Sequence, residues 1–111
     1  MKIPNDAEIL SNKVTNYLLV RRISNDKSKF LARAGFTLDN PDELLVSLRE
    51  LAIEAEAAED GDNEFGTFFR ADGLLAGPNG RALAVATVWL RWHSDGSFHF
   101  VTLKPLRSPR S

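Results

Sequence analysis

Residues 77–92 read Gly77-Pro78-Asn79-Gly80-Arg81-Ala82-Leu83-Ala84-Val85-Ala86-Thr87-Val88-Trp89-Leu90-Arg91-Trp92, and this stretch decides the fold class. Its first four residues are a strong turn signal, because proline restricts φ at one corner while asparagine and glycine tolerate positive φ. We expect positive φ at Gly80. From Arg81 to Trp92 the hydrophobic pattern has a period of two, which predicts the longest strand of the protein.

Shorter segments with the same period lie on both sides of this strand. Phe65–Ala71 and Leu74–Ala76 precede the turn, and Ser97–Lys104 follows a second turn at Ser94-Asp95-Gly96. Pro105, which cannot donate a ladder hydrogen bond, ends the last strand. Because short turns join consecutive strands, we expect an antiparallel meander and not parallel strands with crossovers.

The first 60 residues show helical periodicity instead. Ser11 and Ser24 are plausible N-caps of two helices, the second of which ends at Gly35. A third helix is predicted with Asn40 as its N-cap and Pro41 at its first position. Its apolar face consists of Leu44, Leu48, Leu51, Ala52 and Ala55. Residues 60–63 are predicted to be a loop that ends the helical half.

Together these elements predict an α+β fold with about three N-terminal helices packed on a three- to four-stranded antiparallel meander. The chain of 111 residues is long enough for one such domain. We expect this single domain to span residues 1–106, with residues 107–111 forming a basic C-terminal tail.

The composition excludes several functional classes. Hydrophobic residues make up 43% of the chain, as in an ordinary globular domain. Cysteine is absent, and its absence rules out disulfides, thiolate metal sites and cysteine nucleophiles. Only two histidines are present, and residues 60–64 lack the spacing of a calcium loop. No apolar run is long enough to span a membrane, and the polar N-terminus lacks the apolar core of a signal peptide. We therefore expect a cytoplasmic protein without a metal or cofactor.

The net charge of −1 conceals an uneven distribution. Residues 39–64 carry ten acidic groups and one arginine, whereas residues 1–38 carry seven basic groups and three acidic ones. Residues 80–111 are also basic, with five basic groups and one aspartate. The acidic block is typical of a solvated helix face, and the basic segments would suit a phosphate or an acidic partner.

Strand alternation suggests one sheet face for phosphate and base recognition. If that face is exposed, its donors and flat aromatic ring could contact a phosphodiester and a stacked base. Its residues are Arg81, Thr87, Trp89, Arg91, Thr102 and Lys104. The alternative is an ordinary exposed sheet face or a packed one, with Trp89 in the core together with Leu48. The alanine-rich opposite face of residues 82–92 would let helices approach closely.

Two further candidates stand apart from that face. His99 lies between two phenylalanines of the last strand and could transfer protons near neutral pH. The alternative for His99 is an ordinary surface or hydrogen-bonded histidine. Lys29, in the second predicted helix, could contact phosphate or could be an ordinary solvated lysine.

Several segments resemble a family of small uncharacterised bacterial domains, some labelled adhesin-like and some found as C-terminal modules of polymorphic toxins. The match covers nearly the whole chain in order. The segments that carry it are Lys2–Asn5, Lys13–Leu19, Lys27–Phe30, Gly35-Phe36, Asn40-Pro41, Glu64–Thr67, Gly77–Arg81, Thr87–Trp89 and Val101–Pro105.

The order of helices followed by a meander is similar to that of small metal-independent ribonuclease toxins, which include barnase-like enzymes and messenger-RNA interferases. The resemblance implies cleavage of RNA through its 2′-hydroxyl group, with RNA or a small cognate protein encoded nearby as partners. It implies proton transfer by His99, and phosphate positioning by Thr87 and Thr102. Arg81, Arg91 and Lys29 or Lys104 would stabilise the phosphate charge.

One departure matters for activity. Relatives often carry a histidine just before the lysine-rich segment, where this chain has Asn25-Asp26. An inactive relative of the ribonuclease toxins is therefore one alternative. A second is a non-catalytic interaction module that docks another protein through the acidic helix or an exposed sheet face. Cleavage of RNA distinguishes an active ribonuclease toxin from this module.

Overall fold

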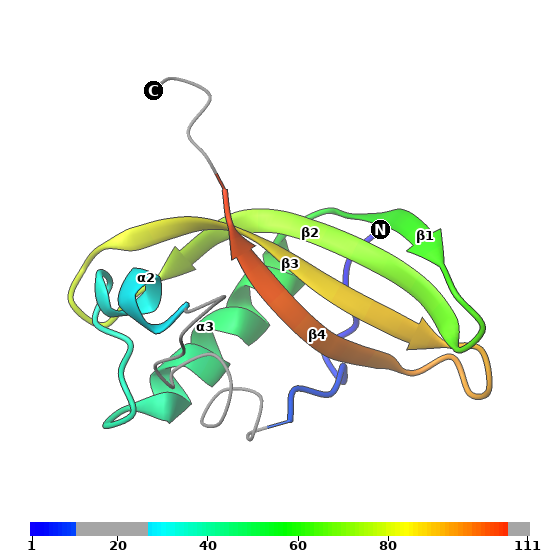
Figure 1. Ribbon diagram of the computed structural model, residues 1–111, viewed down its shortest axis with the longest axis horizontal. Coiled ribbons are helices and arrows are strands. Elements are labelled where there is room, and N and C mark those ends of the chain that lie inside the picture. The colour runs from blue at the N-terminus through cyan, green and yellow to red at the C-terminus, as the bar shows by residue number, and fades with distance from the viewer. Residues whose placement is uncertain (11–26, 107–111) are drawn as a thin grey trace.

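The computed structural model describes residues 1–10 and 27–106. Helices α2 (Ser28–Ala32) and α3 (Pro41–Glu54) precede four strands. These are β1 (Ala57–Asp62), β2 (Gly66–Ala76), β3 (Ala82–Trp92) and β4 (Phe98–Pro105). The strands form one sheet in the order β1-β2-β3-β4, and every neighbouring pair is antiparallel (Figure 1). The α+β class and the antiparallel meander are confirmed, whereas the predicted first helix lies outside the described residues.

Helix α3 begins where the sequence predicts, although its cap differs from the expected one. Pro41 occupies the first turn, and two acidic residues there suit the positive end of the helix. The Asn40 side chain makes no capping hydrogen bond. Its Oδ1 accepts from the Thr37 amide at 2.8 Å and its Nδ2 donates to the Gly35 carbonyl at 3.0 Å. Asn40 therefore closes the loop between the two helices.

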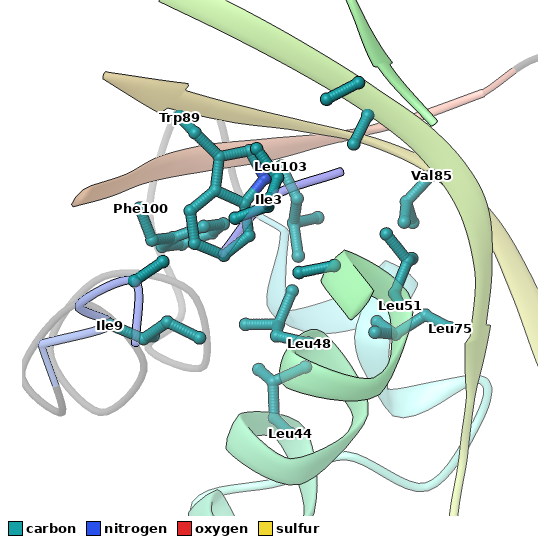
Figure 2. Packing of buried hydrophobic residues seen from close by; sticks show 14 of the residues in the cluster. Ile3, Ile9, Leu44, Leu48, Leu51, Leu75, Val85, Trp89, Phe100 and Leu103 are labelled. Atoms are coloured by element: carbon teal, nitrogen blue, oxygen red, sulfur yellow. The ribbon is translucent and has the colours of Figure 1, made fainter. Parts of the chain in front are cut away.

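Helix α3 packs across one face of the sheet and builds the core there. Leu44, Leu48 and Leu51 point towards a set of buried sheet residues (Figure 2). Those labelled in the figure are Leu75, Val85, Trp89, Phe100 and Leu103. Gly73 of β2 permits the close approach, because a Cβ atom there would lie 3.1 Å from Leu51 Cγ. The predicted core positions Leu48 and Trp89 are both buried.

The alanine-rich face of β3 is not the one that the helix covers, so that expectation was wrong. The helix packs on the opposite face, where Leu83, Val85 and Trp89 are buried. Large apolar side chains remove more area from water than alanine methyl groups, and burial free energy scales with that area. We call the sheet face turned away from α3 the open face.

The acidic stretch after α3 also differs from the prediction. Residues 57–62 form edge strand β1, and the predicted loop at residues 60–63 lies largely within it. Ala57 and Ala58 pair with Ala71 and Arg70 of β2. The sequence of β1 has no hydrophobic period of two, so no side-chain pattern indicated a strand here. Backbone pairing with β2 holds the strand in place. Strand β2 joins the two predicted segments before the turn into one strand.

An irregularity in β4 changes which residues share a face. Val88 pairs with Thr102 and Trp89 pairs with Phe100, so Val101 is an extra residue in β4, as in a β-bulge. Beyond the bulge the alternation is reversed. His99 and Thr102 therefore both lie on the open face, whereas simple alternation predicts that they lie on opposite faces.

The N-terminal segment extends the sheet beyond β4. The Glu8 amide donates to the Phe98 carbonyl at 2.8 Å, and the Phe100 amide donates to the Glu8 carbonyl at 2.8 Å. These bonds form a parallel bridge between Glu8 and His99. At its other end the segment is anchored beside β1, where the Met1 ammonium donates to the Ala57 carbonyl.

A buried hydrogen-bond chain inside the core provides a stability test. Trp89 Nε1 donates to Thr87 Oγ1 at 2.8 Å, and that hydroxyl donates to the Ala71 carbonyl at 2.7 Å. Thr87→Val keeps the shape but leaves the indole N–H without its acceptor, so we expect a loss of about 1–3 kcal/mol in the free energy of unfolding. Denaturant unfolding measures it. The matched change Thr102→Val, on the half-buried open face, should cost less than about 0.5 kcal/mol. Equal losses would contradict the assignment.

The turn before β3 provides a second test. Gly80 has φ of +87°, as the sequence predicts, and a Cβ atom there would meet nothing within 4 Å. Substitution therefore adds backbone strain without a steric clash. We expect Gly80→Val to cost at least about 1 kcal/mol, and Gly80→Asn to cost less because asparagine tolerates this conformation. Equal thermal midpoints for the two variants would show that positive φ does not select glycine here.

Candidate functional site

The candidate site lies on the open face around His99. This residue pairs with Leu90 of β3, and its side chain is 19% exposed. Its Nδ1 lies 3.2 Å from Glu8 Oε1, and its Nε2 lies 2.7 Å from Ser97 Oγ. The indole of Trp92 stacks on the imidazole at a centroid distance of 3.9 Å and an interplanar angle of 19°. His99 is thus held by polar partners at both ring nitrogens and by an aromatic ring over its plane.

The turn between β3 and β4 positions Ser97. Asp95 Oδ1 accepts hydrogen bonds from the Ser97 hydroxyl at 2.6 Å and from the Ser97 amide at 2.9 Å. These bonds, the hydroxyl first, lower the pKa of the Asp95 carboxyl below its ordinary value. A continuous polar chain therefore runs from Glu8 through His99 and Ser97 to Asp95.

This chain determines what the imidazole can do chemically. When the ring carries two protons, both nitrogens donate, Nδ1 to the Glu8 carboxylate and Nε2 to the Ser97 hydroxyl. When it carries one proton, the Ser97 hydroxyl can donate to the free Nε2, but only by giving up its hydrogen bond to Asp95 Oδ1, because a hydroxyl group has a single proton. His99 can thus take up or release a proton without losing either partner, which is what general acid–base chemistry needs.

Two other predicted residues share the open face with His99. Thr102 pairs with Val88 and Lys104 pairs with Ala86, so both lie along the same strand as the histidine. Lys104 is exposed and forms no ion pair with any residue that the structure describes. In contrast, the guanidinium of Arg70 on β2 is committed to Asp72, with contacts of 2.7 and 3.1 Å. Lys104 is therefore the cation of this face that is available to a phosphate.

The structure places Thr87 and Trp89 in the core, where both are 0% exposed. They belong to the face under α3, so the prediction that this face is exposed was wrong. The reason is packing, since the Trp89 ring fills the space between α3 and β4 and makes an edge contact with Phe100 at 5.3 Å. Neither residue can reach a substrate in this structure.

The remaining basic residues are separated from His99. Arg81 lies in the turn just before β3, nine residues from the partner of His99, or about 30 Å at the usual rise of a strand. Arg91 faces the other side of the sheet, with its guanidinium 5.3 Å from the centre of the Phe69 ring. Lys29 lies on α2, beside a shallow pocket lined partly by Phe36. The predicted set therefore divides, and only His99, Thr102 and Lys104 share the open face. The β3 partners of His99 and Lys104 are four residues apart, or about 13 Å at the usual rise of a strand.

An open groove of about 650 Å³ adjoins the histidine. Its lining residues are Glu64, Phe65, Leu90, Trp92, His93 and Ser94. Phe65 is 65% exposed and Trp92 is 42% exposed, which is unusual for large aromatic side chains. The groove thus combines apolar walls with a few polar groups, as small-molecule sites do.

Sequence reasoning missed Glu8, Ser97 and Trp92. Ser97 and Trp92 could have been found, because each lies two residues from a position on the open face and strand side chains alternate. Glu8 carries no such signal, since 91 residues separate it from His99. Within residues 1–10 and 27–106, no group of three or more His, Asp or Glu side chains could hold a metal ion. No helix in those ranges is long and apolar enough to cross a membrane.

Comparisons with known proteins complete the description. No curated protein matches the sequence significantly. A solved structure resembles the fold with a TM-score of 0.69 at 16% sequence identity, over 93% of this chain and 96% of the other. That structure is a complex of a contact-dependent growth inhibition toxin with its immunity protein from Klebsiella pneumoniae 342. A family model, the domain of unknown function DUF6883, matches residues 2–107. The chain therefore belongs to the DUF6883 family.

Proposed function

We propose that this chain is a ribonuclease-type toxin module that cleaves RNA without a metal ion, from the open face around His99. The observation that carries the proposal is the imidazole held between Glu8 and Ser97 on an uncovered sheet face. The similarity of this fold to that of a chain from a toxin–immunity complex adds support at the level of the fold. The resemblance to C-terminal modules of polymorphic toxins, found in the sequence, points the same way.

The proposed reaction uses the nucleophile that RNA itself carries. His99 removes the proton from a 2′-hydroxyl group, whose oxygen then attacks the adjacent phosphorus. The bond from phosphorus to the 5′-oxygen of the next nucleotide breaks, and that oxygen takes up a proton from solvent water as it leaves. His99 then returns the proton of the 2′-hydroxyl group to solvent. The products are a 2′,3′-cyclic phosphate and a free 5′-hydroxyl group.

Neighbouring side chains have distinct roles in this proposal. Lys104 stabilises the charge that develops on the phosphate, and the Thr102 hydroxyl donates a hydrogen bond to it. Glu8 is a positioning residue, because its carboxylate orients the ring through Nδ1. Proton transfer then takes place at Nε2, where the 2′-hydroxyl group replaces Ser97 as the partner. Thr87, Trp89, Arg81 and Arg91 have no place in the reaction, given where they lie.

Cleavage of a single-stranded RNA by the purified full chain, in the presence of a chelator, tests the proposal. His99→Ala should lower the rate about 10²–10⁴-fold, the usual contribution of a general acid or base. Lys104→Ala should also lower it, whereas Arg81→Ala removes the same charge far from the site and should not. A 2′-deoxynucleotide at the scissile position should abolish cleavage, because the nucleophile is missing.

Two results would contradict the proposal. An intact chain that neither cleaves RNA nor slows growth when expressed would be an inactive relative, consistent with Asn25-Asp26 in place of the histidine of relatives. Cleavage that is unchanged in His99→Ala would place the chemistry elsewhere.

A second candidate function is a non-catalytic module that binds a small cognate protein. The outer side of α3 favours it, because Val46 is 56% exposed and Ile53 is 50% exposed on a helix with several acidic side chains. A chain from a toxin–immunity complex as structural neighbour agrees with such a partner. This candidate predicts a stable complex with a protein encoded nearby and no RNA cleavage by the isolated chain.

A further inference from the structure

Two features mark the groove beside His99: a glycine pairs with the tryptophan that lines it, and this tryptophan stacks on the histidine. Gly66 is the cross-strand partner of Trp92, so no side chain stands beside the indole on the β2 side. Trp92 itself leans towards β4, where it stacks on His99. A Cβ atom at Gly66 would clash with the Arg91 carbonyl and lie 3.1 Å from Leu90 Cδ1. The β3 backbone therefore passes so close to residue 66 that only glycine fits there.

The backbone holds Phe65 rigidly although its side chain is exposed. Asn63 Oδ1 accepts hydrogen bonds from the amides of Phe65 at 2.9 Å and Gly66 at 3.0 Å. The Phe65 carbonyl accepts from the His93 amide at 2.9 Å. A ring that is 65% exposed on so well-anchored a backbone is preorganised for contact, since little backbone freedom is lost when a ligand binds.

The geometry points to a subsite for one unpaired nucleobase in this groove. Phe65 and Trp92 offer aromatic surface on which any base can stack, and Leu90 forms an apolar floor. The groove volume of about 650 Å³ lies within the range of small-ligand sites. The carboxylate of Glu64 at the rim would repel a phosphate but accept hydrogen bonds from the N–H groups of a base.

This subsite rests on the proposed ribonuclease function and completes it. Because Trp92 both lines the groove and stacks on His99, a base in the groove would lie one aromatic ring away from the imidazole. The phosphate that follows the base could then extend along β4 towards Thr102 and Lys104. The groove would thus set the position of the RNA relative to the proton-transfer group.

Binding of a short single-stranded deoxyribo-oligonucleotide tests the subsite without cleavage, since the probe lacks the 2′-hydroxyl. A second oligonucleotide of the same length with abasic positions carries the same backbone charge but no bases. We expect the base-bearing oligonucleotide to bind more tightly and to quench the fluorescence of the exposed Trp92. Phe65→Ala should weaken its binding about 10- to 100-fold, the usual effect of removing one stacking partner. Binding of the abasic oligonucleotide should not change.

Leu74→Ala is the matched control, because Leu74 is 68% exposed on the open face of β2 but lies outside the groove. It should leave binding of both oligonucleotides unchanged. Trp92→Leu should weaken binding as Phe65→Ala does, and melting followed by circular dichroism verifies that each variant is folded. Phe65→Ala is the cleaner variant because Phe65 makes no ring contact with His99 among the described residues.

The outcomes separate the subsite from the proposed function. If base-bearing and abasic oligonucleotides bind alike, or Phe65→Ala binds as the wild type does, the nucleobase subsite is wrong. Cleavage of RNA that still depends on His99 would then leave the ribonuclease function standing. If neither oligonucleotide binds and RNA is not cleaved, both proposals fail, and an apolar side chain of a protein partner becomes the occupant that fits the groove.

Discussion

The contact between α3 and the Trp89 face of the sheet is the constraint on which the other features depend. Burying a leucine or a larger apolar side chain stabilises a protein by about 1.5–3 kcal/mol, whereas three of the six β3 side chains on the opposite face are alanines, which offer only single methyl groups. The helix therefore covers Leu83, Val85 and Trp89. This choice removes Thr87 from solvent and leaves His99 on the face that nothing in the described chain covers.

A single extra residue in β4 then determines which side chains accompany His99. Without the bulge at Val101, His99 would lie on one face and Thr102 and Lys104 on the other. The bulge is compatible with the core because it returns Leu103 to the buried face beside Phe98 and Phe100. One irregularity thus preserves the packing on one side and assembles a polar surface on the other.

The N-terminal segment contributes to the site from a distance. It runs from the edge at β1, where Met1 is anchored, to the edge at β4, where Glu8 bridges to His99 (Figure 1). Arg49 of α3 holds it on the way by donating to the Ala7 carbonyl at 2.8 Å. The carboxylate that orients the imidazole is therefore positioned by backbone pairing, and its place depends on the folded core.

The sequence by itself determined the class of fold and most of its elements. Proline at the first position of α3, the turn with positive φ at Gly80 and the period of two along β3 are local signals, so they could be recognised without tertiary contacts. The same signals indicated His99, Thr102 and Lys104 as candidate residues. They could not indicate β1, whose acidic sequence forms a strand only because β2 offers a backbone partner.

Tertiary structure alone decided which face of the sheet is open and what surrounds the histidine. Alternation defines two faces but not which of them a helix will cover, because that depends on the area each face buries against α3. Alternation also assumes a regular strand, and one bulge reverses which side chains of the strand lie on each face. The pairing of Glu8 with His99, and the groove lined by Phe65 and Trp92, arise from contacts between residues far apart in the chain. No local pattern encodes such contacts, so only the folded chain could show them.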